Sequence, residues 1–230
     1  MSSNTSHLNG KNFQTIDVKA NIKILLIEVN TLRNDKSFNQ KHEKKVRHWD
    51  KQLKSFLDKI SIIEEKVIPL IKRDLEDSIS DNLIITALLQ PSLKNVFDEI
   101  KTHFKTKTEI GISEEMLEKL VAGPDTAKNL AWIGDTAIRY AILKRIWKPG
   151  LTTKDLHNKR MELETNENLS ILCDKWVLFE NRIHFDPDVP KDKKLSKIKG
   201  TLVEAIFGVI FIEKGYDKVT SAVSLIDRSV

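Results

Sequence analysis

Two short stretches decide the fold and chemistry of this chain: Leu130-Ala-Trp-Ile-Gly-Asp135 and Lys199-Gly-Thr-Leu-Val-Glu-Ala205. Each stretch places one carboxylate, Asp135 or Glu204, inside an otherwise apolar run. Acidic side chains are rarely buried without a partner. Two of them in such settings indicate a shared site that holds a cation.

The spacing within each stretch suits helices that present acids on one face. Positions 131 and 135 share a face of a helix, and so do positions 201 and 204. If the two helices cross, four side chains converge, and four acids there would bind hard cations such as Mg²⁺. Ala131 and Thr201 stand at two of the four positions. Asp135 and Glu204 remain, and two carboxylates suffice for one hydrated Mg²⁺ better than for a two-metal site.

Two alternatives stay open for these carboxylates. In the first alternative, Asp135 and Glu204 form ion pairs with basic side chains instead of binding a metal, for instance with Arg139 one helical turn after Asp135. In the second alternative, other acids supply the carboxylate oxygens that Ala131 and Thr201 lack. The candidates are Glu162, Glu164 and Asp125. No sequence pattern places those three at the site, and a solvated helix face is the simpler role for them.

Composition predicts an all-α fold. The chain has 230 residues, of which 40% are hydrophobic and 31% charged, with 8 Gly and 6 Pro. Such long Lys-, Glu-, Leu- and Ile-rich stretches favour helices. Pro149-Gly150 should end the helix that carries Asp135. The apolar spacing predicts helices at 17–32, 46–71, 81–90, 94–105, 113–121, 126–147, 153–173, 197–214 and 217–227.

The chain is expected to divide into two parts. Residues 1–65 form an N-terminal helical extension, whose first 15 residues are polar and expected to be disordered. Residues 66–230 form the main domain. The amphipathic helix predicted over 46–71 packs on its own domain or offers a coiled-coil-like surface to a partner protein.

Several classes of function are disfavoured. The net charge of +5 is a mild lean towards a polyanionic partner. Cys173 is the single cysteine, which fits a buried structural thiol in a reducing compartment and builds no zinc site. The sequence has no Gly-rich phosphate loop, no nucleophile elbow, no apolar run that would span a membrane and no signal peptide. We therefore expect an intracellular protein, cytoplasmic or organellar.

At these motifs the chain resembles the ribonuclease III family. Residues 130–136 resemble the family signature Leu-Glu-Phe-Leu-Gly-Asp-Ala, and residues 200–208 resemble its second acidic motif, Ala-Asp-x-Phe-Glu-Ala-Leu-Ile-Gly. Residues 87–95 resemble its Ala-Leu-Thr-His-Pro-Ser-Tyr stretch, and residues 159–169 its Leu-Arg-x-x-Leu-Val-Ser-Asn-x-x-Leu helix. The resemblance covers about residues 66–227 and implies the all-α ribonuclease III endonuclease fold.

The resemblance also implies a reaction and an assembly. Members of the family hydrolyse double-stranded RNA with Mg²⁺, so Asp135 and Glu204 would be catalytic metal ligands, with Mn²⁺ as the alternative ion. The domain would form a homodimer through the signature helix, with Trp132 and Ile133 at the interface. Mini-III members keep one Asp and one Glu and still cut RNA, whereas other members have lost catalysis and bind RNA in mitochondrial ribosomes. We therefore expect an endoribonuclease for double-stranded or structured RNA or, as the alternative, a catalytically inactive RNA-binding or ribosome-associated scaffold.

RNA affinity must come from this domain or from its extension, because no double-stranded-RNA-binding domain is expected after it. Lysines gather just before the Glu204 helix, where phosphate contact would be sequence-independent and salt-sensitive. A solvated lysine-rich loop is the alternative reading. The residues expected to contact RNA are Lys159, Arg160, Lys191, Lys193, Lys194, Lys197 and Lys199.

Overall fold

The computed structural model describes residues 16–33, 40–104, 111–185 and 192–226. It confirms the all-α fold class, since these residues contain helices and no β-strand. An isolated parallel bridge between Leu89 and Ile183 is the nearest approach to sheet within the described ranges. The disorder predicted for residues 1–15 concerns residues outside those ranges.

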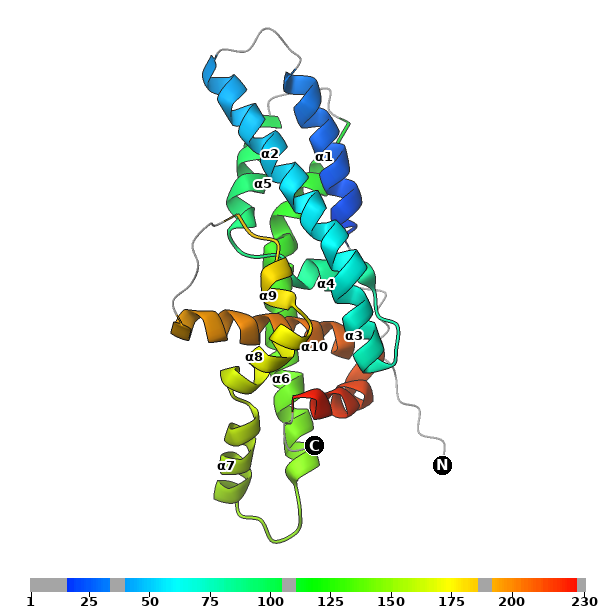
Figure 1. Cartoon of the computed structure of the whole chain (residues 1–230), viewed down its shortest axis with the longest axis vertical. Coiled ribbons are helices and arrows are strands. Elements are labelled where there is room, and N and C mark those ends of the chain that lie inside the picture. Colours follow the sequence, from blue (N-terminus) through cyan, green and yellow to red (C-terminus); the bar gives the residue numbers. More distant parts are fainter. Residues whose placement is uncertain (1–15, 34–39, 105–110, 186–191, 227–230) are drawn as a thin grey trace.

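Ten α-helices make up the described structure (Figure 1). A π-helical turn joins α2 to α3, and a 3₁₀ turn follows α10. In chain order the elements are α1 (Val18–Arg33), α2 (Gln40–Ile62), the π turn (Ile63–Val67), α3 (Ile68–Leu75), α4 (Asp81–Ala87), α5 (Leu93–Phe104), α6 (Glu114–Ile146), α7 (Thr153–Leu163), α8 (Asn166–Lys175), α9 (Leu178–Asn181), α10 (Asp192–Ala222) and the 3₁₀ turn (Val223–Leu225).

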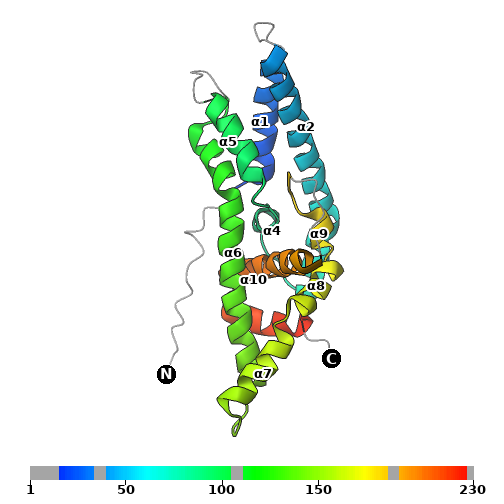
Figure 2. The same ribbon diagram turned by 90° about the vertical axis from the view of Figure 1, so that its left-hand side faces the viewer.

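Helices α6 and α10 form the central crossing of the fold, with α10 lying across the long axis of α6 (Figure 1, Figure 2). Glycines let the two backbones touch. A Cβ atom on Gly134 would lie 1.8 Å from the carbonyl oxygen of Glu204, and one on Gly208 would lie 2.0 Å from the carbonyl oxygen of Leu130. No other residue type fits at either position, so the two glycines of the motifs set how closely the helices approach.

Helices α1 to α3 pack into the same core as the rest of the chain. The apolar residues of the helix predicted over 46–71, such as Trp49, Leu53 and Phe56, are buried. The indole Nε1 of Trp49 donates to Glu99 of α5 at 3.2 Å. The apolar face of this helix therefore packs on its own protein. The boundary predicted between residues 65 and 66 falls inside the π turn, in an uninterrupted helical stretch.

The helix prediction differs from the structure at two places in this part of the chain. The helices predicted at 113–121 and 126–147 are one helix, α6, because Gly123 and Pro124 are buried inside it and it continues through them. The helix predicted at 153–173 is interrupted, since Thr165 caps a new helix by accepting a hydrogen bond from the amide of Asn168 at 3.1 Å. The predicted boundary between the helices at 197–214 and 217–227 is confirmed, because the backbone of α10 leaves helical geometry at Gly215, where two helical segments meet.

Candidate acidic site

The α6–α10 crossing brings Asp135 and Glu204 together. Gly134 lies against the backbone of Glu204, and Asp135 follows Gly134 directly on α6. The side chain of Asp135 is 31% exposed, and Glu204 is half-buried. Both carboxylates thus sit beside the point of closest helix contact, in the places that the motif spacing suggested.

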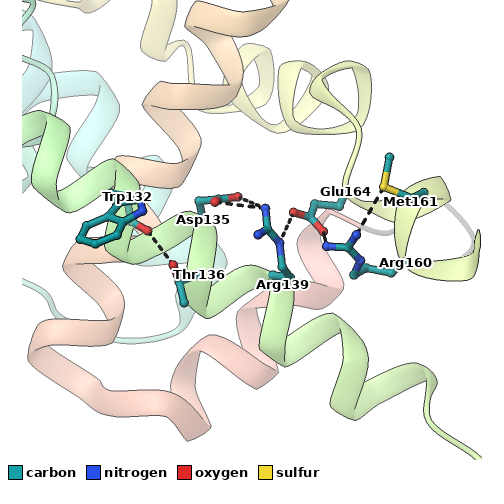
Figure 3. A network of polar contacts seen from close by, with 7 residues as sticks. All are labelled: Trp132, Asp135, Thr136, Arg139, Arg160, Met161 and Glu164. Carbon is teal, nitrogen blue, oxygen red and sulfur yellow. Dashed lines mark hydrogen bonds and ion pairs between the residues drawn. The ribbon is translucent and has the colours of Figure 1, made fainter. Parts of the chain in front are cut away.

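Arg139 binds the acids of this site. Its Nη2 atom donates to both carboxylate oxygens of Asp135, at 3.2 Å each. Its Nε atom donates to Glu164 at 2.9 Å, and Arg160 donates to the other oxygen of Glu164 at 3.0 Å. Figure 3 shows the guanidinium between the two carboxylates, so that one cation bridges α6 and the C-terminal end of α7.

The charges of the site act most strongly on Glu204. Burial, followed by the negative charges of Asp135 and Glu164, raises the pKa of Glu204 to about 7. The positive charges of Arg139 and Lys197 oppose that rise. Glu204 therefore holds its proton more tightly than an ordinary glutamate does.

Arg139 responds to the same set of acids. Its pKa is raised, first by the hydrogen bond to Glu164 and then by the charges of Glu164, Asp135 and Glu204. Three carboxylates thus act on one guanidinium. Arg139 is therefore the basic side chain that the described structure places among these acids.

The donors of the site, as they lie, do not fit a divalent metal centre. Magnesium takes carboxylate and water oxygens in octahedral geometry, whereas the oxygens of Asp135 and Glu164 already accept hydrogen bonds from arginines. Among the described residues, no group of three or more His, Cys, Asp or Glu side chains could hold a metal ion. Ala131, which has no oxygen to offer, is buried at the crossing, and Thr201 is exposed on α10.

Of the three extra acids considered from the sequence, Glu164 joins the site and the others do not. Asp125 pairs with Lys94 at 2.7 Å and Lys128 at 3.2 Å, and Glu162 is exposed. Glu164 comes into position because α7 ends at Leu163. The signal in the sequence is Thr165. It is a helix N-cap residue, so it predicts that one helix ends and another begins directly after this acid.

The predicted RNA-contacting residues divide into exposed and paired side chains. Arg160 is held by Glu164, and Lys199 by Asp174 at 2.6 Å and by the ring of Phe179, whose centroid is 5.8 Å away. Lys191 and the side chain of Lys193 lie outside the described structure. The exposed members of the set are Lys159, Lys194 and Lys197.

Trp132 and Ile133, the predicted interface residues, differ in exposure. Trp132 is 75% exposed, and Figure 3 shows it pointing away from Arg139 and Glu164. Ile133 is partly buried. A tryptophan this exposed on the central helix is costly in water, which marks this side of α6 as a candidate interface.

Cys173 is buried, and burial raises the pKa of its thiol to about 12, so it acts as a structural side chain. No helix within the described ranges is long and apolar enough to cross a bilayer.

Comparison with protein families identifies one region of the chain. Residues 128–215 match the family model described as the ribonuclease III domain. The matched region contains both acidic stretches and ends at Gly215, where α10 breaks. It confirms the resemblance that the motifs indicated. No curated protein matches the chain.

Proposed function

We propose that this chain, whose residues 128–215 match a ribonuclease III domain, binds double-stranded or structured RNA without cutting it, although that domain by itself supports a ribonuclease-type endonuclease in general. The observation that carries this proposal is Arg139. Its guanidinium hydrogen-bonds Asp135 and Glu164 and takes up the negative charge that would otherwise draw a metal ion.

The chemistry of RNA hydrolysis supports this reading. Domains of this family are in general dependent on a divalent metal. Metal-assisted hydrolysis needs carboxylate oxygens that are free to coordinate the ion. Here both carboxylate oxygens of Asp135 accept hydrogen bonds from Arg139. Mg²⁺, or Mn²⁺ in its place, would have to displace an internal ion pair before it could act.

RNA binding itself does not depend on the acids. Lys159, Lys194 and Lys197 are exposed and lie on α7 and at the start of α10. Lysines placed in this way contact phosphates, and duplex RNA is recognised by its shape and its 2′-hydroxyl groups. We propose these residues as the phosphate contacts of the domain. The intracellular, reducing location stays a prediction.

A homodimer is part of the proposal. Domains of this type usually dimerise, and Trp132 on α6 is 75% exposed in the single chain. Insertion of this indole into a second copy would remove a large apolar surface from water. The two copies would then present their basic residues to one RNA.

A Mg²⁺-dependent endoribonuclease is the second candidate. The observation that favours it is the pair of acids, Asp135 and Glu204, retained side by side at the helix crossing. For this function Arg139 would have to move away from Asp135 when RNA and metal bind.

One experiment separates the two candidates. The full chain is mixed with an end-labelled duplex RNA, and both binding and chain length are measured with Mg²⁺ or Mn²⁺ present. We expect a complex that weakens steeply when salt rises from about 50 to 200 mM, and RNA that stays intact. Divalent-dependent cleavage that disappears in Asp135→Asn and Glu204→Gln would establish the nuclease instead. Failure to bind duplex or hairpin RNA would reject both.

A further inference from the structure

Positive charge is concentrated at one end of the molecule, where α6 ends and α7 begins. We call residues 144–160 the α6–α7 tip; Figure 1 and Figure 2 show it at one extreme of the long axis. The tip carries six basic residues against one acid, Asp155, so its formal charge equals the +5 of the whole chain. The basic residues are Lys144, Arg145, Lys148, Lys154, Lys159 and Arg160.

The single acid of the tip is already engaged. Asp155 accepts hydrogen bonds from the amide and hydroxyl groups of Thr152, at 3.0 and 2.6 Å, in the capping box that starts α7. These hydrogen bonds hold the pKa of Asp155 below its usual range. Lys148, Lys154 and Lys159 are exposed, and none of them forms an ion pair within the described part of the chain. They remain available for an anionic partner.

An exposed aromatic ring stands among these charges. Trp147 caps the C-terminus of α6 in an extended conformation and is 61% exposed. Helix α7 contributes no buried residue, so the tip has no apolar core of its own for this ring to join. An exposed indole beside several lysines is the combination that proteins use to stack an unpaired base while binding its phosphates.

The loop that carries Trp147 is held at both ends. The amide of Trp147 donates to Leu143 at 3.0 Å, and the amide of Leu151 donates to Lys148 at 3.4 Å, which closes a turn around Pro149 and Gly150. Gly150 has φ +88°, the conformation that glycine favours in such turns. Because these hydrogen bonds restrain the backbone of the loop, little backbone entropy is lost when Trp147 binds a ligand.

We propose that the α6–α7 tip binds an unpaired segment of the RNA, with one base stacked on Trp147 and its phosphates on Lys148 and Lys154. This inference rests on the proposed RNA-binding function. Within double-stranded or structured RNA, it predicts a preference for RNAs that have a loop, a bulge or a single-stranded end. The duplex would occupy the body of the domain, and the unpaired segment would lie at the tip.

The test compares two RNAs with the same stem: a hairpin with an unpaired loop, and a blunt duplex. Trp147→Ala should lower the affinity for the hairpin by roughly ten-fold and leave the affinity for the duplex unchanged. Trp147→Phe should retain most of the hairpin affinity, because a phenyl ring still stacks. Lys148→Ala should weaken hairpin binding and reduce its salt dependence. The matched controls are Ile27→Ala, an apolar side chain 62% exposed on α1, and Lys51→Ala, an exposed lysine on α2.

Fluorescence gives a direct readout of stacking. Two of the four tryptophans, Trp49 and Trp176, are buried, so in a Trp132→Phe protein the remaining exposed indole is Trp147. The hairpin should quench this fluorescence and the blunt duplex should not. Equal quenching by both RNAs, or a Trp147→Ala variant that binds the hairpin like the wild type, would overturn the assignment of the tip.

Three outcomes distinguish a failure of this inference from a failure of the proposed function. Vesicles containing phosphatidylserine that shift the emission of Trp147 while the hairpin does not would mark the tip as a membrane contact and overturn the inference. Wild-type protein that binds neither RNA would overturn the proposed function as well. Binding of both RNAs without dependence on Trp147 would leave the function standing and reject the tip alone.

Discussion

At the scale of single residues, Gly134 controls the geometry of the acidic site. Replacing it with alanine would place a Cβ atom 1.8 Å from the carbonyl oxygen of Glu204, which is backbone and has no alternative rotamer. We predict that Gly134→Ala lowers the free energy of unfolding by at least about 3 kcal/mol. Urea denaturation followed by circular dichroism measures this.

Thr136→Ala, two residues further along α6, is the matched control for Gly134→Ala. Thr136 is exposed, and its hydroxyl group donates to the carbonyl oxygen of Trp132 within the same helix. We expect a change of no more than about 0.5 kcal/mol. Equal stability of the Gly134→Ala variant and wild type would contradict the backbone contact between α6 and α10.

Glu204 should make the stability of the protein depend on pH. Below the ordinary glutamate pKa of 4.5, folded and unfolded chains both hold this proton; as pH rises towards about 7, the unfolded chain releases it first. The stabilising contribution of Glu204 is thus complete at low pH and is lost through neutral pH. Glu204→Gln should reduce the loss of unfolding free energy between about pH 5 and pH 8 by on the order of 2 kcal/mol.

Denaturation series at several pH values measure that difference. Glu162→Gln, a change at an exposed acid on α7, serves as the control. If Glu204→Gln and wild type lose stability in parallel over this pH range, Glu204 does not titrate in the way its surroundings require.

The two motif acids could be found from sequence because their spacing on helices is regular. It was harder to predict whether a metal ion or a basic side chain neutralises these acids. Arg139 stood one turn from Asp135 as one alternative to a metal, and helix periodicity alone does not decide between the two. Glu164 could not be placed from sequence, because its position depends on the break between α7 and α8.

At the scale of helices, Gly215 determines where the last part of α10 goes. Its φ of 75° and ψ of −174° are almost confined to glycine, although no atom lies within 4 Å of where its Cβ would be. We predict that Gly215→Ala costs about 1–3 kcal/mol of stability through backbone strain alone. Thermal denaturation, with exposed Ser221→Ala as the control, checks this. An unchanged melting temperature would mean that the break does not need glycine.

Helix positions were predicted well where apolar periodicity was strong, as in the buried run through Trp49 and Phe56. Helix ends were predicted less well. The helices predicted at 113–121 and 126–147 are one helix with Pro124 buried inside it, because burial of the surrounding residues outweighs the one missing hydrogen bond. The Thr165 cap breaks a stretch that periodicity alone presents as continuous.

At the scale of the whole molecule, the exposed face of α6 should join two chains. Trp132→Glu would place a charge at the centre of the proposed interface, where desolvation makes it costly. We predict that wild type sediments as a dimer at micromolar concentration and that Trp132→Glu sediments as a monomer. Ile27→Glu, at an equally apolar exposed position on α1, should leave the dimer intact. A monomeric wild type would reject this interface.

The fold class could be predicted from composition, since a chain with few glycines and prolines has few turns and favours long helices. The packing of α1 to α3 could not, because the hydrogen bond between Trp49 and Glu99 joins residues far apart in sequence. The same limit applies to the acidic site. Arg139 could be named from sequence as a partner of Asp135, but its second contact, with Glu164, could not.

The most direct test of the proposed role of Arg139 is calorimetric titration of Mg²⁺ into the full-length protein and its Arg139→Gln variant. If the guanidinium fills the place of a cation, wild type shows no binding that depends on Asp135. Arg139→Gln gains a site, which is lost again when Asp135→Asn is added. Mg²⁺ binding by wild type that Asp135→Asn abolishes, or an Arg139→Gln variant that binds no more Mg²⁺ than wild type, would contradict the account.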